Sequence, residues 1–271
     1  MADERAIGIF DSGLGGLTVA KELIRRLPQE NIVYFGDTGR VPYGTKSRDT
    51  IRKYACQDER FLLEHNVKLI VAACGTVSSV AADTGKDLPV DFVEVVSHSV
   101  SAAVKATKNG KIGVLGTAAT IRSGAHKKQI LQQMPTATVV ENAATLFVSL
   151  VEEGWYTADD PIVLETVRRY VEPMQAAGVD TLILGCTHFP VLSEAIARVM
   201  GKEVTLINMG SATAEVVARM LEEKDMLNTS SSPTHRFFVS DKADSFCKTA
   251  SVLLGEQINE ALVETVHVDA L

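Results

Sequence analysis

The sequence predicts an α/β fold built from two parallel sheets, each flanked by helices. Short apolar runs alternate with longer segments in which apolar residues recur at helical spacing. This alternation is typical of parallel sheets with helices on their faces. The same order of elements begins again near Lys111, which indicates two similar halves.

Composition limits the classes of protein that the chain can belong to. Its 271 residues are 46% hydrophobic, enough to build the cores of two domains. The net charge is −7, with no lysine and arginine run that would bind phosphates, so nucleic acid is not expected as a partner. No apolar stretch approaches the length of a membrane span, and the amino terminus does not resemble a secretory signal. We therefore expect a cytoplasmic protein that contacts no membrane.

The four cysteines predict free thiols. Cys56, Cys74, Cys186 and Cys247 lie far apart and form no CxxC pair. In a chain without an export signal, this pattern favours reduced cysteines over disulfides or a zinc site. No metal ligand set is expected.

The first half contains four predicted strands. They end before loops that hold small and polar residues, and the loop at 36–44 is rich enough in turn residues to break any regular element. The expected strands are 7–10, 31–35, 67–73 and 92–96, and the expected helices are 17–27, 47–66 and 78–82.

The second half repeats parts of the first. Residues 112–117 follow the pattern of 7–12, residues 179–186 follow 67–74, and residues 204–207 parallel 93–96. Each half thus carries one cysteine, Cys74 or Cys186, at the end of an equivalent strand. A last strand is expected at 237–240, followed by a terminal helix at about 243–261.

A glycine-rich loop follows the first strand. In the loop at 11–16, a dinucleotide-binding GxGxxG motif would require glycine where Thr18 stands, and the chain holds no P-loop motif. The loop can still offer backbone N–H groups to a small anion at a helix amino terminus. Alternatively, Asp11 simply caps the helix.

Cys74 and Cys186 allow several interpretations. Either cysteine alone could be a small buried apolar residue. Cys186 and His188 could form the nucleophile and base of a thiol hydrolase, although residues two apart seldom reach that geometry and Cys74 would have no role. Two equivalent cysteines can instead act as acid and base on opposite faces of one carbon, which inverts a stereocentre.

The chain resembles the bacterial glutamate racemases of the cofactor-independent aspartate/glutamate racemase superfamily. The matching segments are 8–17, Gly36-Asp37 with 41–44, Ala73-Cys74 with Thr76, and 185–188. The resemblance implies two pseudo-symmetric flavodoxin-like domains with the active site in the cleft between them. It also implies a discontinuous first domain, 1–97 plus 210–271, and a second domain, 98–209. A homodimer, glutamate as substrate, no cofactor and a role in supplying D-glutamate for peptidoglycan are expected on the same basis.

The resemblance also implies roles for individual residues. Cys74 and Cys186 would be the two proton donor/acceptors, with Asp11 assisting the first and His188 the second. Glu152 would be the acid near His188, although Glu153 could take its place. The residues expected to bind the substrate are Asp11, Ser12, Pro42, Tyr43, Gly44, Gly75, Thr76, Thr117, Thr120, Thr187 and His188.

Several positions depart from the family pattern. Gly75 stands where asparagine is usual, which would remove a side-chain hydrogen bond to the substrate and widen the pocket. Ala144-Thr145 and Ser149 replace a Cys-Pro pair and a proline, and Asn208-Met209 replaces aspartate-serine. Two further interpretations therefore stay open: a racemase of aspartate or another small acid, and a weakly active paralogue that binds or regulates a partner.

Overall fold

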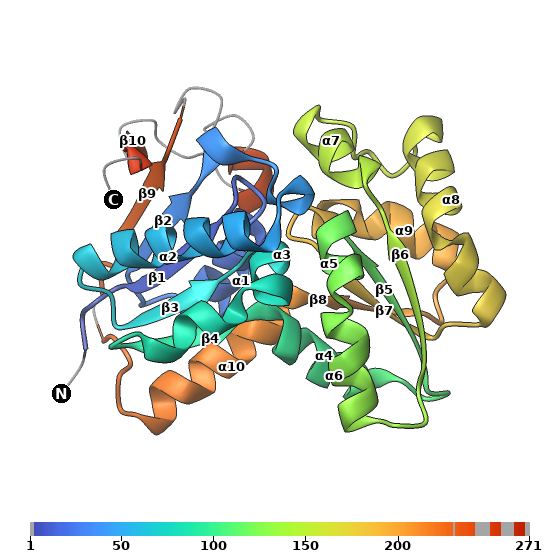
Figure 1. Cartoon of the computed structure of the whole chain (residues 1–271), viewed down its shortest axis with the longest axis horizontal. Coiled ribbons are helices and arrows are strands. Elements are labelled where there is room, and N and C mark those ends of the chain that lie inside the picture. The colour runs from blue at the N-terminus through green and yellow to red at the C-terminus, as the bar shows by residue number, and fades with distance from the viewer. Residues whose placement is uncertain (1–2, 230, 242–249, 256–262, 269–271) are drawn as a thin grey trace.

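The computed structural model describes residues 3–229, 231–241, 250–255 and 263–268. Two parallel sheets lie side by side, and helices cover both (Figure 1). The first sheet has the strand order β10-β9-β2-β1-β3-β4 and the second β6-β5-β7-β8. The expected α/β architecture of two helix-flanked parallel sheets is confirmed.

The elements have the following bounds. The first sheet consists of β1 (Ile7–Asp11), β2 (Ile32–Gly36), β3 (Leu69–Ala72), β4 (Asp91–Glu94), β9 (His235–Val239) and β10 (Val263–Thr265). The second consists of β5 (Lys111–Gly116), β6 (Thr138–Ala143), β7 (Thr181–Gly185) and β8 (Thr205–Asn208). The helices are α1 (Leu17–Arg26), α2 (Arg48–Glu64), α3 (Gly75–Val80), α4 (Val95–Ala106), α5 (Ala118–Ser123), α6 (Ala125–Gln133), α7 (Leu146–Glu152), α8 (Pro161–Ala177), α9 (Ser193–Met200) and α10 (Met209–Glu223).

Strand register shows how closely the halves correspond. Ile7 pairs with Leu69 between β1 and β3, and Ile112 pairs with Thr181 between β5 and β7. Since Cys74 lies five residues after Leu69, and Cys186 five after Thr181, the two cysteines occupy equivalent positions. The expected equivalence of the two cysteine-bearing segments therefore has a direct counterpart in the two sheets.

The proposed match between 204–207 and 93–96 is wrong by three residues. Leu69 pairs with Asp91, and Thr181 pairs with Thr205, so Thr205 corresponds to Asp91. The alignment was misled because 93–96 and 204–207 both read apolar, polar, apolar, apolar, although Val95 and Val96 belong to α4 and not to β4. In the corrected register, Glu94 and Asn208 correspond. Their side chains cap the amino termini of α4 and α10 respectively.

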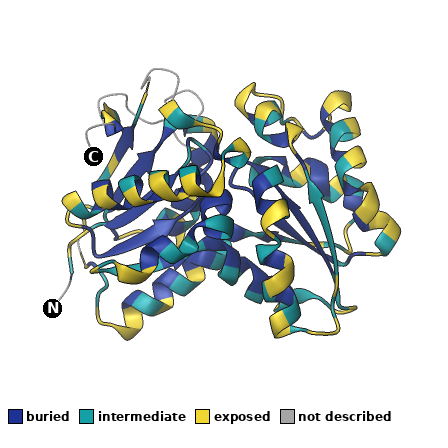
Figure 2. Cartoon of the chain, in the orientation of Figure 1, coloured by how far each residue is buried: buried dark blue, intermediate teal, exposed yellow. Residues whose placement is uncertain are grey.

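The core follows from the sequence pattern. Every residue of β1, β2, β3 and β7 is buried, which agrees with their nearly continuous apolar sequences. Figure 2 shows these strands as the buried interior, while the outer faces of the helices are exposed. β6, at one edge, is only half-buried.

Some boundaries differ from expectation. The helix expected at 78–82 begins at Gly75, directly after Cys74, and β10 was not predicted. The expected loop at 36–44 contains a short 3₁₀ turn at 38–40, and a second turn spans 43–45. Residues 250–254 are helical, but most of the terminal helix expected at 243–261 lies outside the described residues. The domain limits near 97 and 209 remain a prediction; α4 and α10 begin close to these points and pack on each other.

No helix in the described part of the chain is long and apolar enough to cross a membrane.

Candidate active site

A cavity of about 330 Å³ opens between the carboxyl ends of the two sheets. Ligands bind at this edge in open parallel sheets, and the volume suits a small molecule. The cavity is lined by Ser12, Val41, Pro42, Tyr43, Gly44, Thr45, Cys74, Gly75, Thr76, Thr117, Ala118, Ala144, Thr145, Val148, Ser149, Glu152, Cys186, Thr187 and His188. Both halves therefore contribute, and both cysteines reach one cavity.

Cys74 lies at the amino terminus of α3 and is buried beside polar groups of the loop after β1. Its Sγ lies 3.5 Å from Oγ of Ser12. Burial raises the pKa of Cys74 to about 12, and the charge of Asp11 adds to the effect. In the free protein this sulfur is therefore held as a neutral thiol.

Asp11 lies behind this side of the cavity and does not line it. Its carboxylate accepts hydrogen bonds from the backbone N–H of Gly13 at 2.9 Å and from Oγ1 of Thr187 at 3.4 Å. Complete burial raises the pKa of Asp11, while His188 opposes that shift. The contact with Thr187 links the acid of the first half to the loop that carries Cys186.

Cys186 is buried beside an imidazole that a carboxylate orients. Its Sγ lies 3.9 Å from Nδ1 of His188, and Nε2 of His188 lies 3.1 Å from Oε1 of Glu152. Burial alone would lower the pKa of His188, but its contacts with Cys186 and Glu152 raise it. Glu152, at the end of α7, is the acid placed here by the structure, and Glu153 has no contact with His188 among those the structure shows.

The loop after β1 packs directly on the Cys186 segment. A Cβ added at Gly15 would lie 2.3 Å from Oγ1 of Thr187 and 2.5 Å from Nδ1 of His188, so this approach requires glycine. Thr18, at the start of α1, donates a hydrogen bond to the carbonyl of Thr187 at 2.8 Å. The two halves are therefore held together at the floor of the site.

Gly75 lies in close contact with backbone of the other half. A Cβ at this position would lie 2.6 Å from the carbonyl oxygen of Gly185, which belongs to the other half. The missing side chain is replaced by backbone, so glycine here permits a close contact between the halves. Gly75 also lines the cavity, and a wider pocket at this position stays a prediction.

The predicted threonines divide into two groups. Thr76 and Thr117 line the cavity, and their hydroxyls lie 3.1 Å apart across the boundary between the halves. Thr120 is fully buried behind Thr117, with the two hydroxyls 3.0 Å apart, and does not line the cavity. Thr120 could therefore influence a substrate only indirectly, through Thr117.

Val148 and Ser149 line the cavity but were not among the predicted site residues. They lie four and three positions before Glu152 on α7. Residues at this spacing share one face of a helix, so the choice of Glu152 could have identified them.

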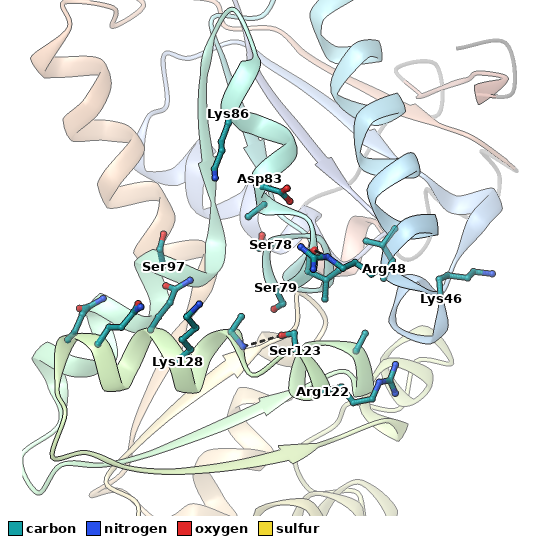
Figure 3. A pocket seen from close by; sticks show the side chains of 18 residues that line it. Lys46, Arg48, Ser78, Ser79, Asp83, Lys86, Ser97, Arg122, Ser123 and Lys128 are labelled. Carbon is teal, nitrogen blue, oxygen red and sulfur yellow. Dashed lines mark hydrogen bonds between the residues drawn. The ribbon is translucent and has the colours of Figure 1, made fainter.

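A second, larger cavity of about 1050 Å³ is lined by residues of α2 and α3 on one side and of α4, α5 and α6 on the other (Figure 3). Its lining is rich in cations, with Lys46, Arg48, Lys86, Arg122 and Lys128. Neither cysteine, and none of the other predicted site residues, lines it. Most of the predicted site residues therefore gather at the smaller cavity.

The smaller cavity has the groups for proton transfer. The three cysteines within the described ranges, Cys56, Cys74 and Cys186, are free thiols; Cys247 lies outside those ranges. In the same ranges, no group of three histidine, cysteine or acidic side chains could hold a metal ion. Two thiols, each with a polar partner, can give and take a proton at one bound molecule.

Comparison with known proteins identifies a family that the chain matches. The family model described as Asp/Glu/Hydantoin racemase matches residues 15–217. A curated glutamate racemase of Geobacter metallireducens is 43% identical over 258 residues, which are 94% of this chain and 95% of that protein.

Two solved structures resemble the whole chain. One is glutamate racemase from Francisella tularensis in complex with D-glutamate, with a TM-score of 0.91, 37% identity, and coverage of 99% of this chain and 100% of that one. The other is glutamate racemase from Thermus thermophilus in complex with β-chloro-D-alanine, with a TM-score of 0.88, 39% identity, and full coverage of both chains.

Proposed function

The chain belongs to the glutamate racemases of the Asp/Glu/hydantoin racemase family, and from this premise we propose that it interconverts L- and D-glutamate with two cysteines as acid and base. The observation that carries the proposal is that Cys74 and Cys186 follow equivalent strands and line one cavity. A carbon held between them could lose a proton to one sulfur and receive one from the other.

The proposed proton transfers balance between the two sulfurs. One cysteine, as thiolate, takes the proton from the α-carbon and becomes a thiol, leaving an electron pair on the substrate. The other cysteine, as thiol, gives its proton to the opposite face and becomes a thiolate. The two cysteines have different neighbours: burial holds Cys74 as a thiol, whereas Cys186 lies beside an imidazole with a raised pKa. A protonated imidazole is the kind of neighbour that stabilises a thiolate.

The other site residues would bind the substrate and position the cysteines. Asp11 would assist Cys74, and His188 with Glu152 would assist Cys186. Hydroxyls and backbone N–H groups of Ser12, Gly44, Thr76, Thr117 and Thr187 would hold the carboxylates and the ammonium group. Neutral donors can bind an anion without fixing the charge of a neighbouring thiol, whereas a lysine would shift its pKa.

The setting of the reaction is part of the proposal. Two catalytic thiols require a reducing compartment, which favours the cytoplasm. There the protein would supply D-glutamate for peptidoglycan, and we expect it to act as a homodimer, as the resemblance implies.

The test is racemisation of L-glutamate followed by circular dichroism. The wild type should abolish the optical signal, and Cys74→Ser and Cys186→Ser should each prevent this. Cys56→Ser, a change of an exposed thiol on α2, is the matched control and should keep full activity. Faster turnover of aspartate would assign the chain to another acid, and no turnover of either would favour a binding protein.

A further inference from the structure

A buried polar cluster lies behind the loop that forms one wall of the smaller cavity. It consists of Asp37, Arg40, Tyr43 and Asp58, and we call it the Tyr43 cluster. The side chains of Asp37 and Asp58 are fully buried, and that of Arg40 is 16% exposed. None of the functions assigned above uses Asp37, Arg40 or Asp58.

Tyr43 and Arg40 each contact both acids. The Tyr43 hydroxyl is hydrogen-bonded to Asp37 and lies 3.1 Å from Oδ2 of Asp58. Arg40 donates from Nε to Asp37 at 2.5 Å and from Nη2 to Asp58 at 3.1 Å. The cluster therefore ties the loop after β2 to the middle of α2.

Two further contacts fix the cluster from neighbouring elements. Nη1 of Arg40 donates to Gln57 of α2 at 2.6 Å. Ser240, directly after β9, donates from Oγ to Asp37 at 2.8 Å. Both acids thus have a partner at each carboxylate oxygen: Asp37 through Arg40, Tyr43 and Ser240, and Asp58 through Arg40 and Tyr43.

The number of hydrogens available for hydrogen bonding in the cluster favours a protonated Asp58. Two buried carboxyl groups face one guanidinium, and a phenol has only one hydrogen to give to two acids. A proton on Asp58 leaves the cluster neutral and supplies a hydrogen for its contact with Tyr43. Burial raises the pKa of Asp58 well above its usual value, the charge of Asp37 adds to this, and Arg40 opposes it.

The groups that face Asp58 come from three segments. Asp37 and Arg40 belong to the loop after β2, Tyr43 to the next turn, and Glu59 to α2 itself. Glu59 accepts a hydrogen bond from the Thr84 hydroxyl, and burial raises the pKa of Glu59 to about 7. When Asp58 is neutral, Arg40 and Asp37 form a balanced ion pair beside it.

The cluster supports residues that would touch the substrate. Val41, Pro42, Tyr43, Gly44 and Thr45 all line the cavity. A Cβ added at Gly44 would lie 3.0 Å from Cβ of Thr117 in the other half, so the loop and Thr117 are already in close contact. Any outward movement of Tyr43 would widen the cavity at this point.

We propose that Asp58, in its protonated form, is a positioning residue that holds the 41–45 segment against the substrate through Tyr43. The proposal rests on the function proposed above. Asp58 does not line the cavity, so it would act on substrate affinity and leave proton transfer at the cysteines nearly unchanged. An ionised Asp58 would also add a negative charge behind the binding site of an anionic substrate.

The first experiment compares Asp58→Asn and Asp58→Ala by steady-state racemisation of L-glutamate. Asparagine keeps the shape and the neutral charge, so KM should stay near the wild-type value. Alanine removes both contacts, so KM should rise by about tenfold while kcat changes by less than about threefold. Asp49→Asn, an exposed change at the start of the same helix, is the control and should match the wild type.

The pH dependence separates protonation from shape. The raised pKa means that wild-type Asp58 is neutral until the pH passes that value. As Asp58 ionises, KM of the wild type should rise, whereas Asp58→Asn should lack this component. An equal alkaline rise in both proteins would overturn the role of the proton.

A double-mutant cycle tests the route through Tyr43. Tyr43→Phe should raise KM, and adding Asp58→Ala to it should raise KM little further, because the contact is already lost. Fully independent effects, or an unchanged KM in Asp58→Ala, would overturn the proposal. If Asp58→Ala does not fold, the pH dependence of KM in Asp58→Asn and the KM of Tyr43→Phe still test the proposal. Absence of wild-type turnover would instead reject the function itself.

Discussion

Oε1 of Glu152 lies 3.1 Å from Nε2 of His188, while the other ring nitrogen of His188 faces the sulfur of Cys186 at 3.9 Å. The imidazole therefore connects a carboxylate of α7 to a cysteine at the end of β7. This arrangement gives Glu152 an electrostatic influence on Cys186 without direct contact.

Glu152→Gln should weaken the side of the site that contains Cys186. Glu152 helps to raise the pKa of His188, so loss of its charge should lower that pKa. The imidazolium would then lose its proton at a lower pH. The alkaline limb of the rate profile should therefore shift to lower pH as well. At mildly alkaline pH we expect a loss of about tenfold. Glu153→Gln is the neighbouring control, and an alkaline limb that does not move in Glu152→Gln would contradict this role.

Asp11→Asn should make Cys74 more reactive toward an alkylating reagent. After burial, the charge of Asp11 is the next contribution that raises the pKa of Cys74. A neutral asparagine should lower this pKa, so more thiolate is present at a fixed, mildly alkaline pH. Iodoacetamide labelling followed by mass spectrometry measures the rate, with exposed Cys56 as internal control. Equal or slower labelling of Cys74 would show that the charge of Asp11 has no such effect.

Gly75→Ala tests the contact between the halves. Helix propensity alone would stabilise the start of α3 by up to about 1 kcal/mol. The new Cβ would meet the Gly185 carbonyl at 2.6 Å, and overpacking of this kind costs about 1 to 3 kcal/mol. We therefore expect a lower free energy of unfolding in urea and a higher KM. A variant as stable and active as the wild type would show that the contact is dispensable.

Lys68→Met should destabilise the fold without changing the chemistry. The fully buried Lys68 ammonium lies 2.6 Å from Glu30 and donates to the carbonyls of Asp3 and Met226. Its loss leaves a buried carboxylate unpaired, which costs about 3 to 5 kcal/mol. Urea unfolding measures this cost, and Lys53→Met on the exposed face of α2 is the control. Equal unfolding midpoints for the two variants would contradict the assigned role of the ion pair.

The sequence predicted those parts of the site that depend on local pattern. Apolar runs locate the strand ends, and Cys74 and Cys186 follow two of these runs. Contacts between segments that are far apart in the sequence were harder to predict. The close contact at Gly75 was not predicted because the atom opposite is a backbone carbonyl of the other half, and no residue type in the sequence signals that contact. Asp58 was missed for a similar reason, since its partners lie in a loop that becomes adjacent only on folding.

Deuterium incorporation during the first turnovers in D₂O tests the central claim most directly. If two cysteines act on opposite faces, early reaction of L-glutamate should place deuterium at the α-carbon of the D-glutamate formed. Recovered L-glutamate should contain almost none, because the sulfur that removes the proton is not the one that returns it. Comparable deuterium in recovered substrate and product, or inversion that persists in Cys74→Ser or Cys186→Ser, would contradict the two-cysteine mechanism.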